Sequence, residues 1–512
     1  MRTGTLSAVK LRRFLAATLA TTVAFALAGL AVPAGAFVPG GKQAAVEDPT
    51  VTGPVTGGGG KPILVAGGDL SGVGYVTEEF FLEGDATSYA PKGKLESDGK
   101  WKMKTADTAP YTTRMVVYRP ESAAAFDGTV FVEWLNVSSG FDSGADWIMG
   151  HTQMIRAGAA WVGISALAVG VQGGRKTVSD FVAPGGIKAN DPERYAALTH
   201  PGDDYSYDIF SQAGVAVRNT GPVKPLGDVK VERVIAIGDS GAAFRLVAYI
   251  NGVHPLAKVY DGFLVHSRSA GSAGFKTSDK YGFDDKRIPD SVITRRDIDV
   301  PVITLQTESD LTLLGYLATT ERDAKNFRLW EVAGSSHADA YTSGGAFSDS
   351  DQGEAESSLL DPAQATVGPL SCAEPINSGP MFAVLNAALF QLERWVRDGT
   401  PAPKAPRLET TRNGKDIKRD EHDIARGGIR TPLVDVPIAT NSGAKNRGGS
   451  FCSLFGRTVP FDAATLADLY PTHDAYVEAF DASADEAVKA GFWTEIDAEQ
   501  FKAAAAGLAI PR

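Results

Sequence analysis

From about residue 62 onward, the chain alternates between short apolar runs and longer segments with helical periodicity. The apolar runs predict strands over residues 75–81, 113–118, 129–135, 160–164, 231–237, 262–265, 302–305 and 327–332. The periodic segments predict helices over residues 207–217, 242–250 and 380–398. Near-continuous apolar strands that alternate with helices are typical of a mainly parallel sheet covered by helices on both faces. The pattern therefore predicts an α/β fold.

Three polar stretches interrupt this alternation, at residues 171–200, 267–298 and 338–377, and together they are rich in Gly, Ser and Asp. Loops of that length inside a compact domain often form lids or other functional surfaces. From residue 461 to the end, the chain is predicted to be helical. No linker isolates any of these parts, so residues 62–512 are interpreted as one domain with three insertions and a helical C-terminal extension.

The first 36 residues have the features of a secretory signal. Residues 2–13 hold four basic side chains and no acidic one, residues 14–32 are mostly apolar, and Ala34-Gly35-Ala36 fits a cleavage site. The signal predicts a protein that is secreted or held in the cell envelope, by either Sec or twin-arginine export. A retained membrane anchor is the alternative. Residues 37–61 are rich in Gly and Pro and predict a flexible leader.

The charge balance limits the classes of partner. The chain has 512 residues, with 61 acidic side chains, 50 Lys and Arg, and a formal net charge of −11 at pH 7. An acidic protein of this kind is repelled by nucleic acid and by anionic membrane surfaces, so neither is an expected partner. No segment after the signal is long and apolar enough for a membrane span. The sequence makes no prediction of oligomeric state.

The chain has only two cysteines, Cys372 and Cys452, which excludes cysteine-rich zinc modules and iron–sulfur clusters. Export would expose both to an oxidising compartment, so a disulfide between them is predicted, with two buried thiols as the alternative. No Gly-x-Gly-x-x-Gly motif follows a predicted strand, and Gly57 to Gly60 lack the Lys-Ser/Thr of a phosphate loop. We therefore expect no cofactor and no metal ion.

The strongest chemical signal is Gly238-Asp239-Ser240-Gly241-Ala242, which lies directly between a predicted strand and a predicted helix. A sharp turn there lifts the Ser240 hydroxyl above the sheet and directs the following backbone N–H toward a bound carbonyl. The small residues around Ser240 leave room for such a crowded turn. A structural turn serine is the alternative, and the two flanking elements favour a nucleophile.

Partners for such a nucleophile are an acid and a histidine, in that order along the chain. Two carboxylates, Glu308 and Asp310, follow the predicted strand at 302–305 and are candidates for the acid. Each also fits a turn or helix-cap carboxylate. His337 follows the next strand after a Gly-Ser-Ser segment, and is the candidate general base. The oxyanion donors are expected from the backbone of Gly241 and from Asn136 or Val137, which follow the strand at 129–135.

Several segments resemble the secreted α/β-hydrolase-domain proteins of bacteria, over roughly residues 62–480. They are VFVEWLNV at 130–137, WVGISA at 161–166, DDYSYDIFSQAG at 203–214, VIAIGDS at 234–240, AYINGVHPLAKVYDGFLVHSR at 248–268, LQTESD at 305–310, WEVAGSSHAD at 330–339 and CAEPINSGP at 372–380. The resemblance implies an α/β-hydrolase fold and serine-esterase chemistry, and it favours Asp310 over Glu308 as the acid. Gly241 and Ala242 stand where the family usually has a larger polar residue and a serine, which leaves the substrate range open.

The resulting hypothesis is a secreted serine hydrolase that cleaves a small-molecule or polymeric ester through Ser240, His337 and Asp310. Acyl transfer to an alcohol or amide hydrolysis would use the same residues, and sequence does not separate these reactions. The competing hypothesis is a secreted binding or cell-surface protein that keeps the fold without catalysis, because a fold alone does not fix a function.

Overall fold

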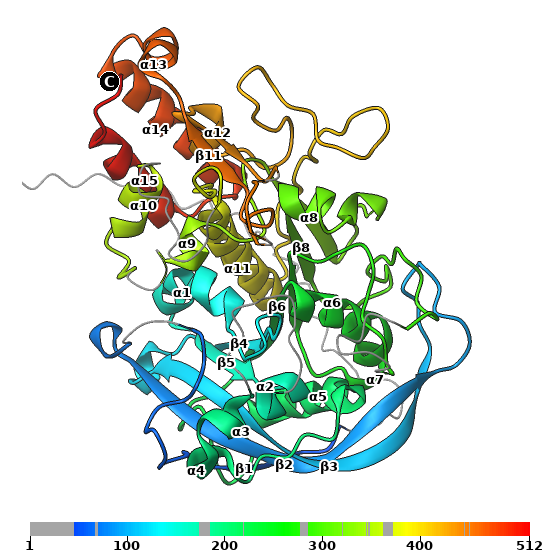
Figure 1. The fold of residues 1–512 in the computed structure, drawn as a ribbon. Helices are drawn as coiled ribbons and strands as arrows, with labels where there is room; N and C mark the ends of the chain where they lie inside the picture. Colours follow the sequence, from blue (N-terminus) through cyan, green and yellow to red (C-terminus); the bar gives the residue numbers. More distant parts are fainter. Residues whose placement is uncertain are drawn as a thin grey trace, which may run out of the picture. The chain divides into compact units, whose positions relative to one another are not determined.

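The computed structural model describes residues 46–66, 70–173, 185–218, 220–276, 285–319, 321–344, 346, 349–361, 372–444, 446–449 and 451–511. The predicted signal at 1–36 lies outside these residues. Within them, nine strands form one sheet in the order β1-β2-β3-β5-β4-β6-β7-β8-β9 (Figure 1). Their bounds are β1 Thr50–Thr52, β2 Tyr75–Pro91, β3 Met103–Pro120, β4 Thr129–Trp134, β5 Ala160–Ile164, β6 Arg233–Asp239, β7 Gly262–His266, β8 Val302–Thr307 and β9 Phe327–Val332.

The larger part of this sheet is parallel, as predicted. The strands β5, β4, β6, β7, β8 and β9 pair in parallel, whereas β1, β2 and β3 add an antiparallel edge. Every residue of β4, β5 and β6 is buried. Strands that are covered on both faces consist of near-continuous apolar runs, which is why the sequence pattern located them.

Helices cover both faces of the sheet. Their bounds are α1 Ala145–Ala157, α2 Ala168–Gln172, α3 Ile187–Asn190, α4 Pro192–Tyr195, α5 Ser206–Ala216, α6 Gly241–Ala248, α7 His254–Ala257, α8 Glu308–Thr312, α9 Ala340–Ser343, α10 Glu354–Leu359, α11 Met381–Asp398, α12 Pro432–Asp435, α13 Ala463–Leu469, α14 His473–Ala490 and α15 Glu495–Ala506. A π-helix at Tyr249–Val253 continues α6. A separate two-stranded sheet pairs β10 (Ala439–Ser442) with β11 (Arg457–Pro460).

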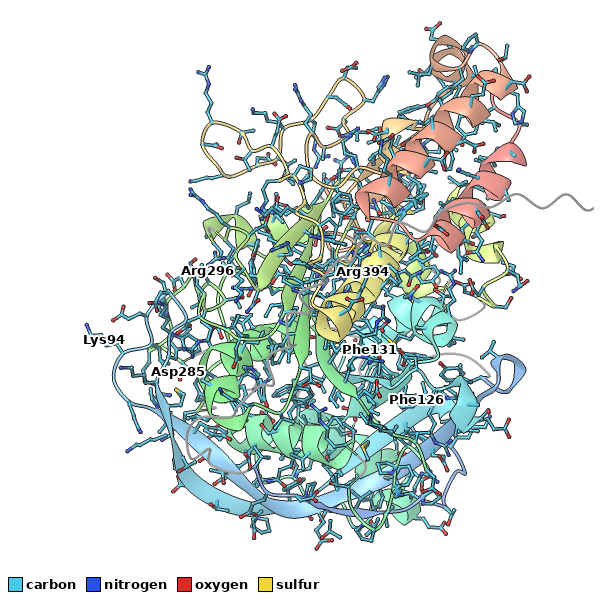
Figure 2. All side chains as sticks on the ribbon, turned by 180° about the vertical axis from the view of Figure 1, so that it is seen from behind. Lys94, Phe126, Phe131, Asp285, Arg296 and Arg394 are labelled. Atoms are coloured by element: carbon cyan, nitrogen blue, oxygen red, sulfur yellow. A yellow bond between two sulfur atoms is a disulfide. The ribbon has the colours of Figure 1, made fainter. Side chains whose placement is uncertain are left out.

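Alternate side chains of each central strand enter two different cores, because successive strand residues point to opposite faces. In β4, Val130 and Val132 pack in one cluster with α5 and α6. Phe131, labelled in Figure 2, belongs to the second cluster, which also holds residues of α1 and α11. The helical C-terminal extension packs on that second cluster through Phe480 of α14 and Phe501 of α15. Among the described residues, no helix combines the length and the apolar character needed to cross a membrane.

The hairpin of β2 and β3 extends well beyond the predicted strands at 75–81 and 113–118. It is the long curved ribbon at the bottom of Figure 1. Its outer half was missed because Gly84, Asp85 and Pro110 interrupt the apolar pattern there. The loop beyond it carries the exposed Lys94, labelled in Figure 2.

The predicted leader and insertions contain more regular structure than expected. The strand β1, within the leader predicted over 37–61, pairs with β2, so this part of the leader is held on the sheet. It was missed because a three-residue strand carries too little alternation to recognise. The insertion at 171–200 contains α3 and α4, and that at 338–377 contains α9 and α10. The described residues of 267–298 form no helix or strand.

Candidate active site

A cavity of about 540 Å³ lies where the parallel strands end, and both Ser240 and His337 line it. A volume of this size is typical of sites for small molecules. Loops that follow the carboxyl ends of parallel strands meet at one edge of a sheet, which is where such folds bind ligands. The cavity therefore lies at the strand ends that the sequence predicts to carry the candidate catalytic residues.

Ser240 occupies the turn between β6 and α6. Its φ of 54° and ψ of −114° lie outside the regions that a serine ordinarily adopts. Its N–H donates to the carbonyl of His266 at 2.9 Å, which holds the turn against the neighbouring strand β7. Strained backbone of this kind is maintained where the surrounding structure requires it, and here it presents the hydroxyl at the cavity.

Ser240, His337 and Asp310 lie in one hydrogen-bonded line, although they come from three separate strand ends. The distance from His337 Nε2 to Ser240 Oγ is 3.0 Å, and that from His337 Nδ1 to Asp310 Oδ1 is 2.6 Å. The Asp310 side chain is fully buried, while 11% of the His337 side chain is exposed. With Nδ1–H donating to Asp310, Nε2 is left to accept the hydroxyl proton of Ser240.

The environment shifts both titrating groups. Burial disfavours the imidazolium form of His337, but the charge and hydrogen bond of Asp310 outweigh this effect and raise the His337 pKa above its usual 6.5. Burial alone would raise the pKa of Asp310, yet the charge of His337 and hydrogen bonds from His337 and Thr307 hold it below its usual range. Asp310 is therefore ionised near neutral pH.

The two carboxylates that the sequence left as alternatives have different surroundings. Asp310 Oδ2 accepts the N–H of Thr307 at 2.7 Å, and the Thr307 hydroxyl accepts the N–H of Asp310 in return, so Asp310 also caps α8. Glu308 points elsewhere: its carboxylate accepts the N–H of Gly334 at 2.7 Å and a hydrogen bond from Arg419 at 2.6 Å. Asp310 is thus the carboxylate that the structure brings to His337.

The candidate oxyanion donors are Gly241, Asn136 and Val137, and all three line the cavity. The backbone N–H of Asn136 donates to the Ser143 carbonyl at 2.9 Å, so the expectation that it faces an oxyanion is wrong. An isolated bridge between Asn136 and Ser143 takes up that donor, which no local sequence pattern indicates. Within the described chain, the N–H groups of Val137 and Gly241 have no protein acceptor, and they remain the candidate donors.

Other residues around the nucleophile were not anticipated. The side-chain amide of Asn136 donates to the Asp239 carbonyl at 3.1 Å, which ties the candidate oxyanion loop to the nucleophile turn. His266, at the end of β7, is fully buried, and its Nδ1 lies 2.8 Å from Asp146 Oδ1. Phe451 and Phe455 line the cavity although they lie more than 100 residues after His337 in the sequence. Only the neighbouring Cys452 marks that region in the sequence.

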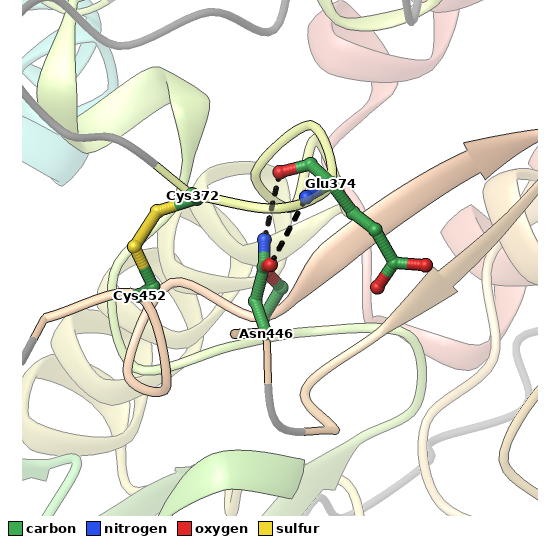
Figure 3. The surroundings of a disulfide bond; sticks show 5 residues. Cys372, Glu374, Asn446 and Cys452 are labelled. Atoms are coloured by element: carbon green, nitrogen blue, oxygen red, sulfur yellow. Dashed lines mark hydrogen bonds between the residues drawn. A yellow bond between two sulfur atoms is a disulfide. The ribbon is translucent and has the colours of Figure 1, made fainter. Parts of the chain in front are cut away.

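The predicted disulfide is present: Cys372 and Cys452 are bonded, beside a pair of hydrogen bonds between Asn446 and the Glu374 backbone (Figure 3). In the described ranges, no three His, Cys, Asp or Glu side chains are arranged to hold a metal ion.

The profile of the family described as alpha/beta hydrolase domain matches residues 51–503. A comparison with curated proteins gave no match. The solved structure of the methylesterase BT1017 is 11% identical to this chain, with a TM-score of 0.28. The alignment covers 56% of this chain and 53% of the methylesterase, so this chain spans about half the length of that protein. An α/β serine hydrolase without a lid from Xanthomonas campestris is 11% identical with a TM-score of 0.24, covering 48% of this chain and 84% of that one. An arylesterase is 12% identical with a TM-score of 0.27, and the alignment covers 43% of this chain and 71% of the arylesterase.

Proposed function

Because the chain belongs to the alpha/beta hydrolase domain family, we propose that it is a serine hydrolase that cleaves carboxylic esters through an acyl-enzyme. The observation that carries the proposal is the continuous line from Ser240 through His337 to Asp310 at the wall of a cavity large enough for a small ester. A protein that kept the fold only for binding would have no need to preserve this geometry together with a strained serine turn.

In the proposed reaction, Ser240 Oγ attacks the ester carbonyl carbon while His337 Nε2 takes the hydroxyl proton. The N–H groups of Gly241 and Val137 stabilise the oxyanion that forms. His337 then gives its proton to the alkoxide, the bond between the carbonyl carbon and that oxygen breaks, and the alcohol leaves an acyl group on Ser240. Water, activated by the same histidine, releases the acid. Asp310 holds the His337 ring in the productive orientation and stabilises its charged form.

We also propose that the protein is exported. The N-terminal segment has the charge and apolar pattern of a signal, and the Cys372–Cys452 disulfide supports an oxidising location, since such bonds rarely persist in the cytosol.

Labelling with a fluorophosphonate tests the nucleophile directly, because this reagent forms a covalent bond only with an activated serine. The wild-type protein is expected to take up one label, and digestion followed by mass spectrometry should place it on the peptide that contains Ser240. A Ser240→Ala variant with an unchanged circular dichroism spectrum should take up none. A folded wild-type protein that is not labelled would favour the binding-protein hypothesis over catalysis.

The pH dependence of ester hydrolysis should follow His337. Only the neutral imidazole can take the Ser240 proton, and Asp310 raises the pKa of His337 above its usual 6.5. We therefore expect kcat/KM to be low in acid and to rise with pH, with its midpoint above pH 6.5. Initial rates measured from pH 5 to 9 with an ester that does not itself titrate would give the profile. A midpoint below 6.5 would contradict the assigned pair of His337 and Asp310.

A further inference from the structure

One wall of the cavity consists of apolar side chains from a single turn at residues 451–455, here called the 451–455 turn. Phe451, Leu454 and Phe455 all line the cavity, and each remains partly exposed. Partly exposed apolar side chains in a concave site gain free energy when an apolar group of a ligand covers them. This wall is therefore suited to a hydrocarbon or aromatic group.

The 451–455 turn is attached to the loop that carries His337. The N–H of Ala338 donates to the Leu454 carbonyl at 3.3 Å. The Ser336 hydroxyl, which donates to the Ala338 carbonyl at 2.6 Å, also lies 3.2 Å from the Phe455 carbonyl. Ser336 and Ala338 flank His337 directly in the chain. The apolar wall thus lies on the His337 side of the cavity.

The chemistry of the proposed reaction assigns the two sides of the cavity to the two halves of an ester. His337 must hand its proton to the departing alkoxide oxygen, so the alcohol half leaves on the His337 side. The acyl half stays on Ser240 and extends the other way. The residues that line that other side include Leu167 and Val169, which follow β5. In the sheet, β5 and β9 lie on opposite sides of β6, the strand that leads into Ser240.

We infer that the substrate is an ester of an apolar alkyl or aryl-alkyl alcohol, and that the 451–455 turn selects this alcohol group. The inference rests on the proposed ester hydrolysis. The Cys372–Cys452 disulfide holds the wall in place, because Cys452 lies within the 451–455 turn (Figure 3). The segment that begins at Cys372 makes a second link, since the Asn377 N–H donates to the Phe455 carbonyl at 2.9 Å. Asn377 in turn donates through its side chain to the Gly334 carbonyl at 2.9 Å, which links the turn to the His337 loop a second time.

Two series of esters test the alcohol half and the acyl half of the substrate separately. The first keeps the butanoyl group and varies the alcohol from ethanol to butanol, hexanol and 3-phenylpropanol, whose similar acidities keep the leaving-group chemistry constant. The second keeps ethanol and lengthens the acyl chain. In the first series kcat/KM is expected to rise by up to about fourfold for each CH₂ that the wall covers, and by at least about tenfold from ethyl to hexyl.

Variants on each side of the cavity provide matched controls. Leu454→Ala and Phe455→Ala each remove apolar contacts from the wall. In each variant, the increase in kcat/KM from the ethyl to the hexyl ester should be no more than about threefold. Leu167→Ala, on the acyl side, should keep the alcohol-length dependence and weaken the dependence on acyl length instead. Cys372→Ala combined with Cys452→Ala should also weaken the alcohol-length dependence. Fluorophosphonate labelling of every variant shows whether the nucleophile remains active.

The outcomes distinguish this inference from the function on which it rests. An alcohol-length dependence that the two wall variants lose and Leu167→Ala keeps would support the inference. The inference would be overturned if the protein hydrolysed the esters of the first series with a kcat/KM that does not depend on alcohol length. It would also be overturned if that dependence survived in both wall variants. Either result would leave the proposed hydrolase intact. A folded wild-type protein that neither takes up the label nor hydrolyses any ester would overturn both.

Discussion

Replacing Asp310 with asparagine is expected to lower kcat for ester hydrolysis by about 10⁴-fold, as loss of the charged acid does in serine hydrolases. Asp310 accepts the Nδ1–H of His337 at 2.6 Å, and an amide in its place favours the wrong tautomer and no longer stabilises the imidazolium. Steady-state kinetics with a short-chain ester would measure the loss. The thermal unfolding curve of the variant would show that the fold persists.

Glu308→Gln is the matched control for this prediction, because Glu308 lies two residues away and is equally buried. Its carboxylate pairs with Arg419 and the Gly334 N–H rather than with His337, so the variant should lose stability but keep kcat within about tenfold of wild type. The reverse result, in which Glu308→Gln lost more activity than Asp310→Asn, would make Glu308 the acid.

Much of the fold was predictable because its determinants are local. The central strands β4, β5 and β6 are buried on both faces, so each forms an apolar run that the sequence displays directly. The family match agrees with the α/β-hydrolase fold that this pattern and the resemblance implied. Ser240, Asp310 and His337 follow the ends of β6, β8 and β9, and their order indicated the candidate triad because parallel strands end at one edge of the sheet.

What the sequence did not predict depends on contacts between distant segments. The apolar wall at 451–455 reaches the cavity from far along the chain. Within the loop after β4, a bridge to Ser143 takes up the N–H of Asn136 and leaves that of Val137 as the candidate oxyanion donor. Residue type and spacing carry no information about such pairings. The disulfide is a long-range contact that the sequence did indicate, because cysteines in an exported chain have few alternatives.

A buried ion cluster supports the loop that carries the candidate oxyanion donor. Arg114 of β3 bonds Glu79 of β2 at 3.1 Å and Asp142 at 3.0 Å, and all three side chains are completely buried. Asp142 lies in the loop between β4 and α1, a few residues after Val137. The Arg114 guanidinium also donates to the Ser165 hydroxyl at 2.9 Å, at the end of β5. The cluster thus joins the antiparallel edge of the sheet to the candidate active site.

Replacing Arg114 with methionine should destabilise the protein by about 3–5 kcal/mol, because the buried carboxylate of Asp142 loses its cation and that of Glu79 retains only Arg194. Arg119 offers a matched control on the same strand: it pairs with Glu78 of β2 at 2.6 Å, but both side chains are partly exposed, at 20% and 27%. Because solvent screens that pair, Arg119→Met should cost less than about 1 kcal/mol.

Urea unfolding of both variants beside the wild type would measure the difference in the free energy of unfolding. Equal losses would mean that solvent or rearrangement compensates the buried carboxylates. A loss of stability confined to Arg114→Met, together with a lower kcat, would indicate that this cluster positions the loop that carries the candidate oxyanion donor Val137.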